Sequence, residues 1–282
     1  MALPPYAEPS ERLAHVAARL FTGAVMFFLI APILVIFPLS FTSGSLLVYP
    51  LPGTSLKYYA EFFNDPLWTR ATWNSFFIAT VVTIVATALG TLAALGLHRS
   101  KSRLKPLILA ILVTPLAIPV VIVAVAMFYY FAWLGLVGTY LGMILAHTVL
   151  AIPFVVVTVT ATLQGFDDNM MRAGASLGAS PGFVFRQVTL PLILPGVVSG
   201  ALFAFVTSFD EIVVALFIAS PIQRTLPRQI FSGVSESVNP TITVAAVVLF
   251  LVSIALMVAM EALRRRSERL RMGAETDTPA NG

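Results

Sequence analysis

The sequence predicts an all-α integral membrane protein with six membrane-spanning helices and a short cytoplasmic helix between spans four and five. Composition leads to this class, because 58% of the 282 residues are hydrophobic and only 11% are charged, with a mean hydropathy of +0.92. A soluble domain carries about 25% charged residues, so the surface of this chain is too apolar for water. The absence of cysteine also excludes a disulfide scaffold and cysteine-ligated metal sites.

Apolar segments long enough to cross a bilayer recur along the chain. A helix needs about 20 apolar residues to cross a hydrocarbon core about 30 Å thick. Residues 106–166 contain no Asp, Glu, Lys or Arg and are long enough for two spans, which we divide at the glycine-containing turn 135–138. The predicted spans are 20–41, 71–97, two within 106–166, 190–219 and 241–260.

Basic residues are distributed unevenly between the two sides that six spans create. With the N-terminus inside, the inner segments contain 13 of the 17 Lys and Arg residues, and the outer segments contain 4. Because basic residues favour cytoplasmic loops, both termini are predicted in the cytoplasm. The predicted divisions are an N-terminal segment (1–19), a six-span domain (20–262) and a basic cytoplasmic tail (263–282). The net charge of +4 therefore reports topology and does not indicate nucleic-acid binding.

Residue patterns of common catalytic and metal sites are missing from the sequence. No lysine follows a glycine, so the chain has no P-loop for ATP. The three histidines, His15, His98 and His147, are far apart and form no metalloprotease motif. We therefore predict no catalytic residue, metal or cofactor in this chain. His147 lies within the fourth span, and we favour a hydrogen bond to a neighbouring helix over a role as ligand or proton relay.

The segment between spans four and five predicts a short helix and a restart of the chain. Residues 170–177 can form about two helical turns, Gly178 suits a C-terminal cap, and Ser180-Pro181 restarts the chain. Small side chains on this helix allow another surface to approach closely. The alternative is an amphipathic helix that rests on lipid headgroups.

This loop resembles the EAA loop of permease subunits of bacterial ABC importers, whose pattern is E-A-A-x3-G-x9-I-x-L-P. With Gly178 on the motif glycine, residues 172–174 (Arg-Ala-Gly) take the E-A-A positions and residues 188–191 (Val-Thr-Leu-Pro) the I-x-L-P positions. The spacing is intact, although Arg replaces Glu, Gly replaces the second Ala, and Val replaces Ile. Residues 208–218, with 225–227 and 239–240, resemble the spermidine/putrescine branch of PotC/PotI type.

The resemblance implies a permease subunit of the bacterial inner membrane that forms half of a translocation pathway. It implies that partner ATPase subunits bind ATP and Mg, so this chain is not an enzyme. The implied partners are a second homologous permease, two ATPase subunits, a periplasmic substrate-binding protein and the lipid bilayer. In such proteins the loop forms a coupling helix against the ATPase. The residues implied to make that contact are Arg172, Ala173, Gly174, Leu177, Gly178 and Ala179.

The branch resemblance implies a small cationic substrate such as spermidine or putrescine, and one pair of carboxylates fits it. Asp210 and Glu211 lie within the fifth predicted span, where a charged side chain usually faces a cavity or a partner. We predict that Asp210 lines the pathway and that Glu211, about 100° further round the helix, faces a protein partner. Alternatively, both pair with the second permease or reach the outer surface.

Other transport functions remain open on the sequence. Import of an opine, an amino-acid derivative or an iron complex is possible, because a fold does not fix its substrate. An ion-coupled secondary carrier is a less favoured alternative, since it predicts inverted repeats that this sequence does not show.

Overall fold

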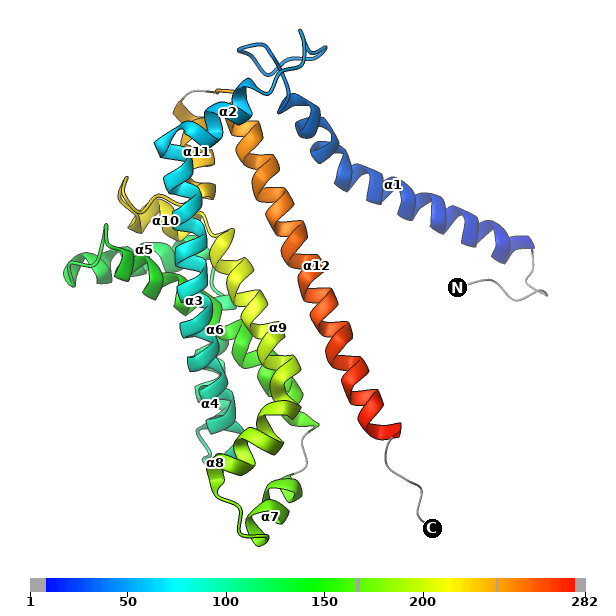
Figure 1. Cartoon of the computed structure of the whole chain (residues 1–282), viewed down its shortest axis with the longest axis vertical. Coiled ribbons are helices and arrows are strands. Elements are labelled where there is room, and N and C mark those ends of the chain that lie inside the picture. The colour runs from blue at the N-terminus through cyan, green and yellow to red at the C-terminus, as the bar shows by residue number, and fades with distance from the viewer. Residues whose placement is uncertain (1–8, 166–167, 237, 277–282) are drawn as a thin grey trace. The chain divides into compact units, whose positions relative to one another are not determined.

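The computed structural model describes residues 9–165, 168–236 and 238–276. Within these ranges every regular element is a helix, and an isolated β-bridge joins Thr42 to Thr54. The predicted all-α class is therefore confirmed. The elements are α1 (Pro9–Leu39), α2 (Lys57–Asn64), α3 (Pro66–Arg99), α4 (Lys105–Val113), the 3-10 turn η1 (Thr114–Leu116), α5 (Val120–Trp133), α6 (Tyr140–Gln164), α7 (Asp168–Ser176), α8 (Pro181–Val184), the π-helix η2 (Phe185–Thr189), α9 (Leu190–Phe209), α10 (Val213–Ile218), α11 (Leu226–Glu236) and α12 (Thr241–Thr276) (Figure 1).

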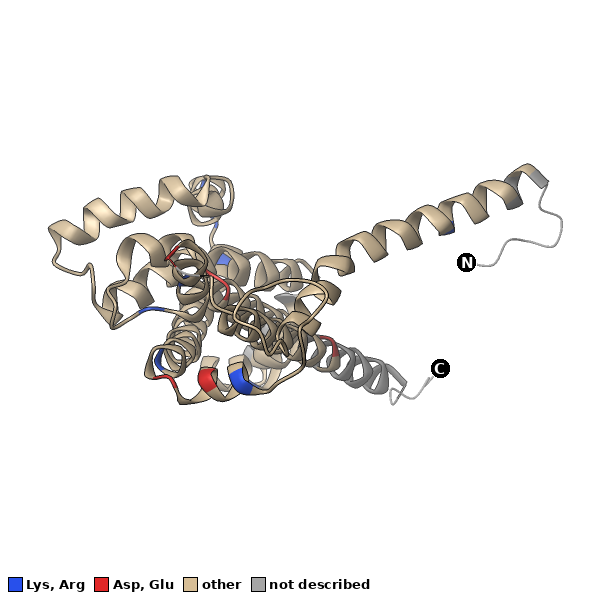
Figure 2. Ribbon diagram, turned by 90° about the horizontal axis from the view of Figure 1, so that it is seen from above, with Lys and Arg blue, Asp and Glu red and all other residues tan. Residues whose placement is uncertain are grey.

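The described residues contain five helices that are long and apolar enough to cross a membrane. They are Leu13–Leu39, Pro66–Arg99, Tyr140–Gln164, Pro181–Phe209 and Thr241–Ala259. A sixth candidate is a bent pair, Lys105–Leu116 with Val120–Trp133, which turns by 101°. The view from above shows few charged positions along these helices (Figure 2), as the hydrocarbon core of a bilayer requires. The described residues thus contain five candidate spans, or six if the bent pair is one span.

Two prolines explain why the bent pair is not a continuous helix. Pro115 lies in η1, and Pro119 precedes α5 with an extended ψ of 126°. Proline cannot donate a backbone hydrogen bond, and it disfavours helical geometry in the residue before it. The predicted third span is therefore interrupted.

The predicted turn between spans three and four is confirmed. α5 ends at Trp133 and α6 begins at Tyr140. Gly135 and Gly138 have positive φ angles of 68° and 75°, which other residues rarely adopt. Thr139 then caps α6, because its side chain accepts a hydrogen bond from the Gly142 backbone N–H at 3.0 Å.

The chain divides into two compact units, residues 1–64 with 233–248 and residues 65–232 with 249–282. In the first unit, the side chains of α1 are exposed along most of the helix. Polar contacts join its connections: Tyr58 donates to the Gly44 carbonyl at 2.7 Å, and Asn239 donates to Glu61 at 3.1 Å.

The second unit is built around α3, α6 and α9, which lie side by side (Figure 1). Glycines let these helices approach closely. A Cβ atom added to Gly90 of α3 would lie 2.7 Å from Val155 Cβ of α6, and one added to Gly200 of α9 would lie 2.9 Å from Val155 Cα. Small residues at helix contacts are typical of membrane bundles, where van der Waals packing drives association.

The predicted continuous fifth span over 190–219 is wrong. α9 ends at Phe209 and a separate helix, α10, begins at Val213. At the other end of the chain, α12 continues past the predicted boundary at 262/263 to Thr276.

Candidate functional site

The break between α9 and α10 places the two predicted carboxylates outside a regular helix. Asp210 is the C-terminal cap residue of α9, and Glu211 precedes α10 by two residues. Asp210 is exposed, whereas Glu211 is only 8% exposed. The assumption that Glu211 lies 100° further round one helix is therefore wrong, because no helix continues through it.

Glu211 forms the cap of α10. Its carboxylate accepts hydrogen bonds from the backbone N–H groups of Val214 at 2.8 Å and Ala215 at 3.0 Å. The first N–H groups of a helix have no partner within the helix, and a side-chain oxygen commonly satisfies them. The negative charge also suits the positive end of the helix dipole. Glu211 therefore has an internal structural partner in its own chain.

His147 of α6 lies between the last turn of α9 and Glu211. Its Nδ1 is 2.9 Å from Ser208 Oγ, and its Nε2 is 3.7 Å from a carboxylate oxygen of Glu211. The side chain is fully buried, and Nε2 makes no hydrogen bond. The interpretation of His147 as hydrogen-bonded to a neighbouring helix is confirmed, since Ser208 belongs to α9.

The combination of Ser208, His147 and Glu211 contains the residue types of a hydrolase triad, but its geometry does not suit that chemistry. Ser208 is 2% exposed and His147 is 0% exposed, so a substrate cannot reach the hydroxyl. Glu211 is already occupied by two backbone N–H groups. The cluster therefore connects α6 to both sides of the α9–α10 break, and Asp210 is the accessible carboxylate of the pair.

The predicted short helix before Gly178 is confirmed as α7, which lies at one end of the second unit beside α8 (Figure 1). Gly178 has a φ of +79°, and the Ala179 N–H donates to the Gly174 carbonyl at 3.1 Å. This i to i−5 bond and the left-handed glycine are typical of a helix C-terminus.

The predicted contact residues of this loop lie on α7 and just after it. Leu177 is 88% exposed, Ala173 and Gly178 are exposed, and Ala179 is half-buried. Gly174 packs near α8, where an added Cβ would lie 3.0 Å from Val184 Cγ2. Arg172 belongs to α7, but its side chain lies outside the described part of the structure.

The second half of the EAA-like pattern falls on an irregular helix. Val188 and Thr189 lie in the π-helix η2, and Leu190 and Pro191 begin α9. Single-turn π-helices are rare and frequently occur at functional sites. No local sequence pattern predicts this irregularity.

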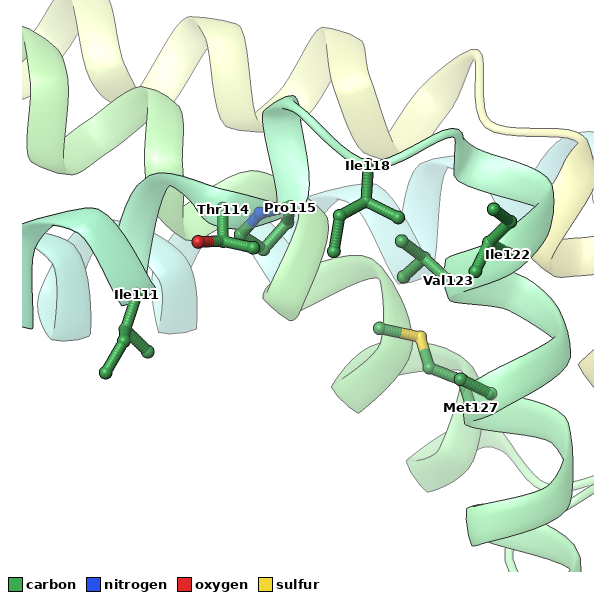
Figure 3. Close-up of a pocket in the computed structure, with 8 residues that line it drawn as sticks. Ile111, Thr114, Pro115, Ile118, Ile122, Val123 and Met127 are labelled. Carbon is green, nitrogen blue, oxygen red and sulfur yellow. The ribbon is translucent and has the colours of Figure 1, made fainter.

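The bend between α4 and α5 contains an apolar pocket of about 350 Å³ that the sequence did not reveal. Met127 and Val123 of α5 line it from one side, and Thr114 and Pro115 of η1 from the other (Figure 3). The lining has no titratable side chain. This pocket therefore suits hydrocarbon and not a charged substrate.

Comparison with known proteins is consistent with a transport role. Residues 86–269 match the family described as binding-protein-dependent transport system inner membrane component. The chain is 31% identical over 245 residues to the spermidine/putrescine transport system permease protein PotC of Escherichia coli (strain K12), covering 87% of this chain and 92% of PotC. It is 34% identical over 227 residues to the putrescine transport system permease protein PotI of the same strain, covering 78% and 80%.

A solved structure shares the fold. The chain aligns with a TM-score of 0.69 and 16% identity to a chain of the bacterial alginate ABC transporter in complex with alginate pentasaccharide-bound periplasmic protein. The alignment covers 91% of this chain and 96% of that chain.

Proposed function

Since the chain belongs to the family of binding-protein-dependent transport system inner membrane components, we propose that it forms half of the translocation pathway for a small cation such as spermidine or putrescine. It is a multi-pass inner-membrane permease subunit of an ABC importer, and ATP hydrolysis belongs to separate ATPase subunits. In our proposal the bent pair counts as one span, so six spans place both termini on the same side of the membrane. The excess of Lys and Arg in the segments on that side indicates that it is the cytoplasm. The proposed complex contains a second permease, two ATPase subunits and a periplasmic binding protein.

The proposal of a cationic substrate depends on one observation. The carboxylate of Asp210 is exposed, and the neighbouring carboxylate of Glu211 is buried. A carboxylate in a partly dry passage attracts ammonium groups and repels anions. Its hydrogen bonds to an ammonium group are charge-assisted and short. The names of the relatives PotC and PotI support the same substrate class.

α7 is the proposed coupling helix. The exposed small residue Ala173 of α7 and the exposed Leu177, directly after the helix, would fit a groove on a partner. The chain passes from α7 through α8 and η2 into α9, and α9 ends at Asp210. Its 20 residues span about 30 Å. A displacement of α7 by the ATPase would therefore be transmitted to the Asp210 region through α8, the π-helix η2 and α9.

Two experiments test this function. Purification of the tagged chain in mild detergent should recover a P-loop ATPase and a second permease in stoichiometric amounts; recovery of the chain alone would contradict the ABC assembly. Uptake of labelled putrescine into cells should fall at least about tenfold in Asp210→Asn, because loss of a charge-assisted contact costs about 1.5–3 kcal/mol.

The matched control for the uptake assay is Glu236→Gln, which neutralises an exposed acid on α11. It should leave uptake unchanged at equal protein level. Equal uptake by the wild type and Asp210→Asn would refute the pathway role of Asp210. If an opine, an amino-acid derivative or an iron complex competes for uptake and polyamines do not, the proposed substrate class is wrong. The proposed importer function would still hold.

A further inference from the structure

Basic side chains gather around a small pocket where the α10–α11 connection meets α3. Its volume is about 100 Å³. Arg70 comes from the start of α3, Arg224 from the connection, and Gln229 from α11. Arg228 lies four residues after Arg224, on the first turn of α11. We call the pocket lined by Leu67, Arg70, Ala71, Pro221, Arg224 and Gln229 the arginine pocket.

The α10–α11 connection is held in place by α3. The Asn74 side chain donates to the backbone carbonyls of Ile222 at 2.8 Å and Arg224 at 3.0 Å, and its oxygen accepts a hydrogen bond from Tyr140 at 2.8 Å. Ser75 Oγ accepts from the Leu226 N–H at 2.8 Å. The backbone that carries Arg224 is therefore ordered before any partner binds.

The hydrogen-bond partners of Arg224 and Arg228 in the described part of the chain are neutral groups. Arg224 donates to Gln229 at 3.0 Å, and Arg228 donates to the Ala219 carbonyl. Among the described residues, no carboxylate forms an ion pair with Arg70, Arg224 or Arg228. The Nε atoms of Arg224 and Arg228 are buried without a hydrogen-bond partner.

The positive charges in this region repel one another. Burial, and then the charge of Arg224, lower the pKa of Arg228 below its ordinary value. The N-terminus of α11, an 11-residue helix, adds partial positive charge. An anion bound here would relieve the repulsion and use the unpaired donors.

We propose that the arginine pocket receives a carboxylate side chain of the extracytoplasmic binding protein, an inference that rests on the proposed importer function. The guanidinium fork matches a carboxylate in bidentate geometry. Gln229, which lines the pocket, belongs to α11, and α11 lies far from α7 in the view of Figure 1. With α7 facing the cytoplasmic ATPase, the arginine pocket opens on the side from which a binding protein approaches.

A lipid phosphate could engage the same arginines, but the structure favours a protein carboxylate. Basic residues are attracted to anionic lipid by the charge of the membrane surface, so this attraction does not require a fixed arrangement of the arginine side chains. Here the backbone is fixed by Asn74 and Ser75. The alginate transporter, which shares this fold, was solved with a periplasmic protein in its complex.

The test uses the complete importer in nanodiscs of zwitterionic lipid and the purified binding protein that co-purifies with it. We expect Arg224→Glu to raise the dissociation constant at least about tenfold, and the difference to shrink as salt rises. Arg70→Glu should act in the same direction, because the Arg70 side chain is exposed and lines the same pocket. Lys57→Glu, an outer cation outside the arginine pocket, is the matched control and should change affinity less than about twofold.

The outcomes separate this inference from the proposed function. ATP hydrolysis without binding protein should be unchanged in both arginine variants. Wild-type affinity in both variants would overturn the arginine pocket as a docking point and leave the importer intact. An effect of the arginine variants that appears only with anionic lipid would assign the pocket to a lipid phosphate. Failure of the wild-type chain to assemble with an ATPase would instead refute the proposed function.

Discussion

Removal of the Glu211 carboxylate tests the most specific feature of the α9–α10 break. In Glu211→Ala, the N–H groups of Val214 and Ala215 lose their acceptor. Both residues are fully buried, so water cannot easily replace the carboxylate. A hydrogen bond to a charged group contributes about 1.5–3 kcal/mol. Two of them predict a loss of about 3–6 kcal/mol in the free energy of unfolding.

Glu211→Gln keeps one side-chain oxygen and should lose about 1.5–3 kcal/mol, because one of the two N–H groups retains an acceptor. The matched control is Asp210→Ala. Asp210 is adjacent but exposed, and its carboxylate accepts no hydrogen bond in the described structure, so we expect a change below about 1 kcal/mol.

Unfolding in detergent, followed by tryptophan fluorescence against increasing SDS, measures these differences. The expected order of stability is wild type and Asp210→Ala, then Glu211→Gln, then Glu211→Ala. Equal stability of Glu211→Ala and Asp210→Ala would refute the capping role and the interpretation of the break that depends on it.

Three other predictions follow from the packing and the turns of the second unit. Gly200→Ala should lower the unfolding temperature, because its Cβ would lie 2.9 Å from Val155 Cα and overpacking costs about 1–3 kcal/mol; Gly96→Ala, with nothing within 4 Å, should not lower it. Asn74→Leu removes three hydrogen bonds, and should lower stability by about 2–4 kcal/mol and speed amide hydrogen exchange over residues 219–226. Gly178→Ala should speed amide hydrogen exchange in α7, because a φ of +79° costs a residue other than glycine about 1–2 kcal/mol. Unchanged exchange in Asn74→Leu or in Gly178→Ala would contradict the contacts assigned to that residue.

Local signals in the sequence predict much of this fold. The glycines of the 135–138 turn and the glycine after α7 have positive φ angles in the structure, as their positions indicated. Each depends on chain geometry within a few residues, which a single sequence contains. Apolar runs likewise predict helices at 71–97 and 241–260, because span length follows from bilayer thickness.

The break after Phe209 could not be predicted by the same means. Apolar residues continue on both sides of Asp210 and Glu211, so the run resembles one span. What ends the helix is the capping of α10 by Glu211 and the contact of Ser208 with His147, a residue 61 positions away. The link from Asn74 to the Arg224 backbone joins residues 150 positions apart and has no local signal either.

The bend at Pro119 has a consequence for membrane insertion. α4 has 9 residues and α5 has 14, so they extend about 14 Å and 21 Å, and neither alone crosses a core about 30 Å thick. In the six-span arrangement that we propose, α4 and α5 must therefore be inserted together as one membrane crossing. Deletion of α5 would remove that crossing and invert every later helix, carrying α7 into the compartment that lacks the ATPase. In that arrangement the orientation of α7 depends on a bend that lies about 50 residues upstream of it in the sequence.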